Sequence, residues 1–128
     1  MSGDLANRLE QLLPNGRGVW IPIAHGLSGY PEEGLDRMDS VIDSIITGGA
    51  DAIVCQKGVL SHQYSRTGWN GFVCHVSAST VHGGTKSQFK VKVASAKEAY
   101  SRGATGVSGQ INLGDENEPS MLRDMGQL

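Results

Sequence analysis

The chain has 128 residues, of which 38% are hydrophobic and 19% charged, and its formal net charge is −2. This balance is typical of a globular protein and excludes a disordered or membrane-embedded one. Acids and bases are interspersed without the basic patch that a phosphate backbone requires, so we expect no nucleic-acid partner.

The amino-terminal stretch, "MSGDLANRLEQLL", has no basic segment followed by an apolar one. No apolar run approaches the roughly 18 residues of a membrane span. We therefore expect a cytoplasmic protein that does not enter a membrane. Cys55 and Cys74 lie in apolar runs and lack CxxC spacing, which favours small buried hydrophobic residues over metal ligands or a disulfide.

The first predicted elements are a helix and a strand. Residues 4–13 form a short amphipathic helix ended by "PNG", and residues 1–17 together are predicted to be a capping helix and turn. "GVWIPIA", at 18–24, is a nearly continuous apolar run, as expected of a parallel strand buried on both faces. From Leu35, apolar residues at helical spacing predict a helix that ends at Gly48-Gly49.

Further strands and helices alternate along the rest of the chain. "ADAIVCQKG" and "GFVCHVSAS" (71–79) are the second and third strands, and "VLSHQYSRTGWN" between them is a short helix or a loop. "VHGGTK" lacks the P-loop pattern and is interpreted as a loop or lid. "FKVKVAS" alternates like a half-exposed strand, "AKEAYSRG" is a short helix, "ATGVSGQINLG" is a fourth core strand, and "ENEPSMLRDMGQL" begins another helix.

Two segments resemble each other internally. "GADAIV" from Gly49 and "GATGVS" from Gly103 share a helix-ending glycine, an alanine and an apolar strand, at a distance that suits two βα units. The alternative is a coincidence in a glycine-rich chain. Together with the alternating elements, the repeat predicts an α/β fold of parallel βαβ units with right-handed crossovers.

Four pieces of the chain, in this order, resemble a known family. They are "RLEQLLPNGRGVWIPIAHG", "YPEEGLDRMDSVIDSIITGGADAIVCQKGVL", "FVCHVSAST" and "AKEAYSRGATGVSGQINLGDENEPSMLRDMG". They are similar to the archaeal-type class I fructose-bisphosphate aldolases and the aminodideoxyheptulosonate synthases, the DhnA-like branch of the DeoC/LacD aldolases. The resemblance implies half of a TIM (β/α)8 barrel, with residues 1–128 as one half-barrel domain and 18–128 as about four βα units.

Such a half barrel leaves two sheet edges and an apolar face open to water, which costs about 25 cal/mol for each Å² exposed. Three solutions stay open: two copies form a complete barrel, a second half-barrel chain pairs with this one, or the sequence is a piece of a longer protein. The resemblance also implies an aspartate immediately before the His-Gly of the first strand, and this chain has Ala24 there. The family's Schiff-base lysine and tyrosine proton donor lie on later strands.

Two candidate catalytic residues come early in the sheet. Lys57 ends the second strand in "CQKGV", at the face where barrel active sites lie, and an enamine mechanism needs a lysine with a neutral amine. The alternative is a solvated or ion-paired lysine. His25 ends the first strand and is a candidate general acid or base, with a structural histidine as the alternative. Ser28, in the loop that follows, is a candidate for substrate binding.

The other candidates follow later strands. His75 is a catalytic candidate, and Ser77, two residues on, shares its face of a strand and is expected to bind substrate. Asn112 is expected to bind substrate hydroxyls. Asp115 is the nearest carboxylate available to replace the one lost at position 24, or it is simply the N-cap of the last helix.

Two functions compete at this point. As an enzyme, the chain is an aldolase-like carbon–carbon lyase or synthase that acts on a small phosphorylated or keto sugar-like substrate. The alternative is a catalytically degenerate aldolase-like subunit that binds a ligand or scaffolds a catalytic partner chain. The four histidines fit no compact ligand motif, so we expect no metal site, and we expect no cofactor.

Overall fold

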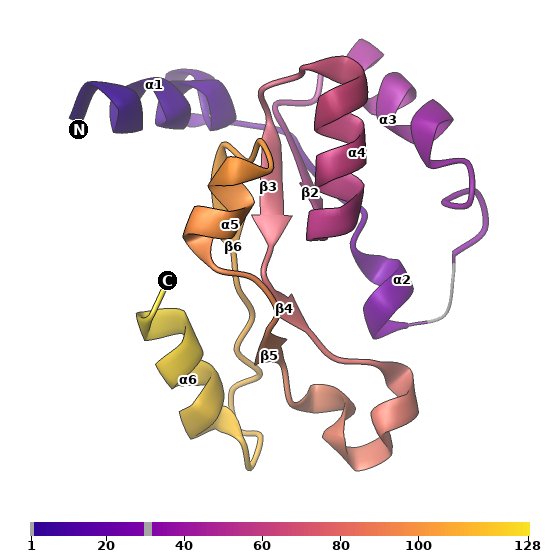
Figure 1. Ribbon diagram of the computed structural model, residues 1–128, viewed down its shortest axis with the longest axis vertical. Helices are drawn as coiled ribbons and strands as arrows, with labels where there is room; N and C mark the ends of the chain where they lie inside the picture. The colour runs from indigo at the N-terminus through magenta and orange to yellow at the C-terminus, as the bar shows by residue number, and fades with distance from the viewer. Residues whose placement is uncertain (1, 30–31) are drawn as a thin grey trace.

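The computed structural model of the chain describes residues 2–29 and 32–128, without the side chains of residues 2, 3 and 28 (Figure 1). Its centre is a four-stranded sheet in the order β1-β2-β3-β6, and all three neighbouring pairs are parallel. Helices lie between successive strands, which confirms the predicted parallel βα units. The strands are β1 Trp20–Pro22, β2 Ala52–Cys55, β3 Phe72–His75 and β6 Gly106–Ser108.

The main core lies between one face of this sheet and the helices α3 (Met38–Thr47), α4 (Lys57–Thr67) and α5 (Ala96–Ser101). Alternate strand residues point toward the helices, as the two-residue period of a strand requires. Cys55 and Cys74 are register partners on this face, so the prediction that both are buried apolar side chains is confirmed. The buried cluster comprises Ile23, Ile42, Ile53, Cys55, Leu60, Phe72, Cys74, Val76, Ala94, Ala99 and Ala104.

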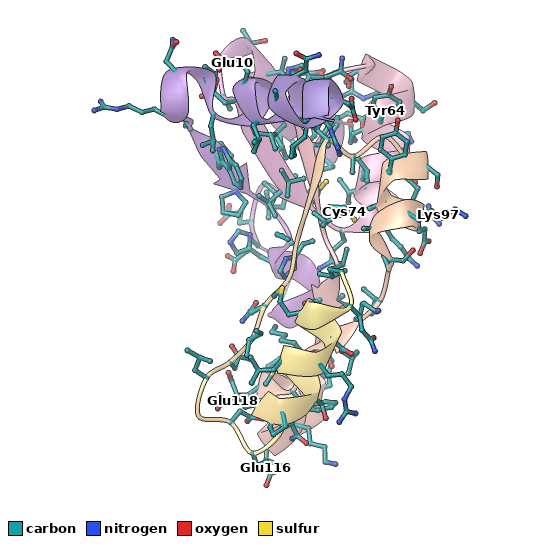
Figure 2. All side chains as sticks on the ribbon, turned by 90° about the vertical axis from the view of Figure 1, so that its left-hand side faces the viewer. Glu10, Tyr64, Cys74, Lys97, Glu116 and Glu118 are labelled. Atoms are coloured by element: carbon teal, nitrogen blue, oxygen red, sulfur yellow. The ribbon has the colours of Figure 1, made fainter. Side chains whose placement is uncertain are left out.

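The opposite face of the sheet, here called the inner face, carries a much smaller core. Ala52 and Val73 pack there with Leu12, the last residue of α1 (Ser2–Leu12), and half-buried Val54 borders them. The indole Nε1 of Trp20 donates a hydrogen bond of 2.8 Å to the Leu12 carbonyl oxygen. Helix α1 lies at the amino ends of the strands (Figures 1 and 2). Beyond this small cluster, Trp20 and Pro22 are exposed on the inner face.

The prediction of a first strand buried on both faces is wrong. Trp20 is 40% exposed and Pro22 is also exposed, although Ile23 just after them is buried. The physical reason is position: β1 is an edge strand with a single neighbour, β2, and nothing in the described chain covers its inner side. An apolar run indicates burial in the complete fold and does not say which segment provides the cover.

The predicted third strand divides into two elements. β3 ends at His75, and β4 (Ser77–Ala78) pairs antiparallel with β5 (Val91–Lys92), which is the predicted half-exposed strand. Between β4 and β5 the predicted loop forms η2 (Val81–Gln88), a segment of 3-10 turns. This hairpin lies beyond the carboxyl end of β3 (Figure 1).

The remaining elements agree in type with the sequence, except that β1 ends at Pro22 and the predicted strand end and loop from His25 to Ser28 form the short helix α2. The segment that stayed open between helix and loop is α4, a regular helix, and Gly49 and Gly103 both adopt positive φ angles after their helices. No helix in the described residues is long and apolar enough to cross a membrane. The other short elements are η1 Pro14–Gly16, α2 His25–Ser28 and α6 Glu118–Gly126.

Candidate active site at the carboxyl ends of the strands

The carboxyl ends of parallel strands meet at one edge of the sheet, and segments that follow them come together there. In this chain α2 follows β1, and the β4–β5 hairpin follows β3 on the same side (Figure 1). In Figure 2, α6, marked by Glu118, lies at this end of the molecule, and α1, marked by Glu10, lies at the other.

His75 is the best-placed of the predicted catalytic residues. It is the last residue of β3, half-buried, and a register partner of Ser108 at the end of β6. Its Nδ1 lies 2.8 Å from Ser108 Oγ, a contact that fixes the ring orientation. Burial, and then the positive charge of Lys90, lower the pKa of His75 below its usual value. The imidazole is therefore neutral at neutral pH and able to accept a proton.

Ser77 and Asn112, predicted to bind substrate, are both engaged in hydrogen bonds within the chain. The backbone N–H of Gln110 donates to Ser77 Oγ at 2.9 Å, and the Gln110 side-chain amide donates to Asn112 Oδ1 at 2.9 Å. The Asn112 amide donates in turn to the Gln88 carbonyl oxygen at 2.6 Å. These bonds tie the segment after β6 to the hairpin and give the edge around His75 a defined shape.

Lys57 does not join His75 in any contact that the structure describes. It is the first residue of α4, and its Nζ donates to the Val93 carbonyl oxygen at 2.9 Å and to Glu98 Oε1 at 3.1 Å. Arg102 binds the same carboxylate at 3.0 Å. The hydrogen bond from Lys57 is the main cause that holds the pKa of Glu98 below its usual value. Burial opposes it, and the smaller effect of the Arg102 hydrogen bond again lowers the pKa. This geometry favours the ion-paired alternative for Lys57.

His25 and Asp115 stand apart from His75. His25 is the exposed first residue of α2, next to a groove of about 240 Å³ that Ala24 and Leu27 help to line. Asp115 Oδ2 accepts a hydrogen bond of 2.8 Å from the backbone N–H of Asn117, which is the N-cap of α6. Asp115 thus supports the start of the helix from two residues before its cap. The side chain of Ser28 lies outside the described part of the structure.

Sequence reasoning missed Lys90, which is buried at this edge with 6% of its surface exposed. Its backbone N–H lies 3.3 Å from the sulfur of Met121 in α6. Burial lowers the pKa of the Lys90 amine, and its charge is close enough to lower the pKa of His75. The only sequence signal was the alternation of "FKVKVAS", which puts Lys90 and Lys92 on one side of a strand but does not show that α6 covers that side.

The chemistry available at this edge is proton transfer. His75 is a half-buried neutral base, and Ser108 fixes its ring. Across residues 2–29 and 32–128, no three His, Cys, Asp or Glu side chains gather as metal ligands.

The fold is that of a solved class of aldolase. A structure of the Schiff-base-forming fructose-1,6-bisphosphate aldolase superposes with a TM-score of 0.73 at 20% identity, over 94% of this chain and 50% of that one. An archaeal fructose-1,6-bisphosphate aldolase superposes with a TM-score of 0.72, again at 20% identity, over 94% of this chain and 49% of the other. These structures establish the likeness as half of a barrel.

Relatives with similar sequences also match this chain over only part of their own length. The 2-amino-3,7-dideoxy-D-threo-hept-6-ulosonate synthase of Halobacterium salinarum is 30% identical over 90% of this chain and 43% of its own length. The 2-amino-4,5-dihydroxy-6-oxo-7-(phosphonooxy)heptanoate synthase of Streptomyces griseus is 33% identical over 82% of this chain and 38% of its own length. The chain thus spans less than half the length of these relatives. The profile of the DeoC/LacD family aldolases matches residues 19–128, and the chain belongs to this family.

Proposed function

We propose that this chain forms half of an aldolase-type barrel that makes or breaks a carbon–carbon bond in a small phosphorylated or keto sugar-like substrate. The observation that carries the proposal is His75, a half-buried neutral imidazole held 2.8 Å from Ser108 at the carboxyl edge of the sheet. Aldol chemistry moves a proton between oxygen, carbon and water, and a positioned imidazole does this at neutral pH. Family membership supports the reaction class.

The remaining site residues have supporting roles in this proposal. Ser77 and Asn112 shape the substrate side of the edge through their bonds to Gln110. His25, exposed at the start of α2, contributes to substrate binding. Lys57 links α4 to α5, because its amine forms a salt bridge with Glu98.

The proposal requires cover for the inner face of the sheet. Residues 18–128 then act as about four βα units of a larger barrel, and a second copy, another half-barrel chain or a further part of a longer protein supplies the rest. Support comes from Trp20 and Pro22, which are exposed on that face, and from the superposition on half of each aldolase barrel.

A second candidate function has its own observation. Ala24 occupies the position before His-Gly where the resembling family carries an aspartate, and Lys57 is held by Glu98. A chain that lacks this aspartate and whose Lys57 amine is bonded to Glu98 is suited to binding a ligand or holding a catalytic partner chain in place. Both functions require ligand binding, and only the enzyme converts the ligand to product.

The deciding experiment measures cleavage of fructose 1,6-bisphosphate by the full chain, by aldehyde release, together with binding of the same compound by calorimetry. We expect turnover, and we expect His75→Gln to reduce it by about 10² to 10⁴, the usual contribution of a general acid or base. Ser108→Ala reduces it less, because it frees the ring without removing the base. His82→Gln, an exposed histidine of η2, is the matched control.

Binding without turnover would support the scaffold function and contradict the enzyme. Turnover that His75→Gln leaves unchanged would contradict the assignment of His75. Absence of both binding and turnover with this compound and with other phosphorylated ketoses would contradict both functions.

A further inference from the structure

A hollow of about 480 Å³, here called the amino-end hollow, lies at the end of the sheet opposite to His75. Asn70 and Thr105, which line it, come just before β3 and β6, whereas His75 is the last residue of β3. Helix α1 forms one wall, and Figure 2 shows Tyr64 of α4 at the same end of the molecule as α1, marked by Glu10. Small-molecule sites in proteins occupy about 300–1,000 Å³, so the hollow is large enough for a ligand.

Two tyrosine rings form the apolar part of this hollow. Tyr64 is 37% exposed and Tyr100 is 65% exposed, and each lies in the last turn of its helix, α4 or α5. A Cβ atom on Gly103 would meet the Tyr64 ring, so the ring rests on the backbone there and is held in place. A tyrosine ring offers an apolar face to a ring-shaped ligand and a hydroxyl group to its edge. The two helices therefore present stacking surfaces from separate sides of the hollow.

Three exposed amide side chains form much of the polar part. Asn7 and Gln11 are four residues apart in α1, a spacing that puts them on one side of the helix, and Asn70 comes from the segment before β3. Among the residues that the structure describes, none of these three side chains has a hydrogen-bond partner. An amide carries a donor and an acceptor side by side, as do two neighbouring hydroxyl groups of a sugar. The amides are thus open to a ligand rich in hydroxyl groups.

The charge of the hollow is balanced. Among the described residues that line it, Arg8 carries the only formal charge, and its Nε lies 3.2 Å from Asp4 Oδ2. The carboxyl end of α4, which borders the hollow, adds a partial negative charge. A phosphate group is usually bound by arginine or lysine charge in excess, and no such excess is available here. The electrostatics favour a neutral ligand.

We propose that the amino-end hollow binds a neutral sugar that carries no phosphate group. The tyrosine rings stack on the apolar face of the sugar ring, and the amides of Asn7, Gln11 and Asn70 bind its hydroxyl groups. This inference goes beyond the proposed function and does not rest on it, because the hollow and the edge around His75 lie at opposite ends of the sheet.

The test is a titration of the full chain, labelled with nitrogen-15, with glucose, galactose and cellobiose. The NMR signals of the amide side chains report binding at the hollow directly. We expect saturable shifts of the Asn7, Gln11 and Asn70 signals with at least one of these sugars. Tyr100→Ala should weaken this binding by about tenfold, because it removes one stacking ring from an exposed position.

Two further variants match this measurement. Gln11→Ala removes one exposed amide from the hollow and should also weaken binding, which provides a test that does not depend on the tyrosines. Gln127→Ala removes an exposed amide that lies outside the hollow, beyond the last residue of α6, and should leave sugar binding unchanged. Glucose 6-phosphate should bind at the hollow no more tightly than glucose, because no free positive charge awaits its phosphate group.

Several outcomes would overturn the inference. They are the absence of saturable shifts with all three sugars, tighter binding of glucose 6-phosphate than of glucose at the same amides, and sugar binding that both Tyr100→Ala and Gln11→Ala leave unchanged. Adenosine that binds there more tightly than every sugar would show that the hollow selects an aromatic ring instead. Cleavage of fructose 1,6-bisphosphate is measured separately, so loss of sugar binding leaves the proposed function standing.

Discussion

At the scale of single residues, two glycines that follow equivalent helices differ in the space available to a side chain. Gly49 and Gly103 both have positive φ angles, 88° and 106°, which side chains of L-residues rarely adopt. A Cβ atom on Gly49 would meet nothing within 4 Å, and one on Gly103 would meet the ring of Tyr64. The repeated sequence predicted the turn at both places, and only the fold shows the close approach of α4 at the second.

We expect Gly103→Ala to destabilise the chain more than Gly49→Ala. The backbone strain, about 1–2 kcal/mol, is common to both substitutions. Gly103→Ala adds overpacking against Tyr64, which costs about 1–3 kcal/mol in comparable cases. Urea unfolding of the two variants measures the difference. Equal losses would mean that the Tyr64 ring moves aside freely, and Gly103→Ala with Tyr64→Ala should recover the overpacking part.

The second residue-scale prediction concerns the titration of His75. Burial and the charge of Lys90 lower its pKa in the folded chain, so the unfolded chain binds more protons below about pH 6.5. The neutral His75 therefore contributes stability that is present above pH 6.5 and lost as the pH falls through this range. NMR titration should place its midpoint below the ordinary histidine value of 6.5, and Lys90→Met should raise it. An unchanged His75 midpoint in Lys90→Met would show that the charge of Lys90 does not act on His75.

At the scale of elements, the salt-bridge joint between α4 and α5 depends on Glu98. Lys57 and Arg102 approach its carboxylate at 3.1 and 3.0 Å and lower its pKa. A carboxyl group with a lowered pKa stabilises the fold above its unfolded value of about 4.5, and this contribution is lost as the pH falls below it. Since the side chain of Glu98 is 33% exposed, solvent screening keeps the effect modest.

We expect Glu98→Gln to lower the urea midpoint at pH 7 and to change it much less at pH 3. Glu33→Gln, on an exposed carboxylate, is the control and should change neither value. If the cost of Glu98→Gln is the same at both pH values, the carboxylate acts through packing and not through its charge. Lys57→Met should show the same pH dependence as Glu98→Gln.

Local sequence patterns predicted the type of nearly every element, because hydrophobic spacing and helix-ending glycines act over a few residues. The division of the third strand at Val76 could not be predicted, since it follows from the pairing of Ser77–Ala78 with Val91–Lys92 across η2. The same limit applies to the site. His75 was found because it ends a strand, whereas burial of Lys90 depends on α6, an element about thirty residues away in the chain.

At the scale of the whole molecule, the inner face of the sheet is a surface that the described residues leave largely uncovered. Trp20, 40% exposed, and half-buried Val54 lie on this face, and Leu5 and Leu9 of α1 are exposed near its amino end. In both aldolase structures that superpose on the chain, the match covers about half of the barrel. Apolar surface of this kind gains about 25 cal/mol for each Å² removed from water. We therefore expect this face to be covered, as in the proposed completion of the barrel.

We expect the full chain to associate through this face, and Val54→Lys to prevent it. In an isolated half barrel the new lysine reaches water from the half-buried position at little cost, but a closed barrel would enclose an unpaired charge. Light scattering over a range of concentrations measures the assembly, and Val91→Lys, at a position 41% exposed on β5, is the control.

In a Trp69→Phe background, emission from Trp20 should shift to shorter wavelength on assembly of the parent chain and stay unshifted with Val54→Lys. A parent chain that stays monomeric at all concentrations, with solvent-exposed Trp20 emission, would contradict self-assembly and leave a second half-barrel chain or a further part of a longer protein as the cover. Association that Val54→Lys does not disturb would show that copies meet through another surface.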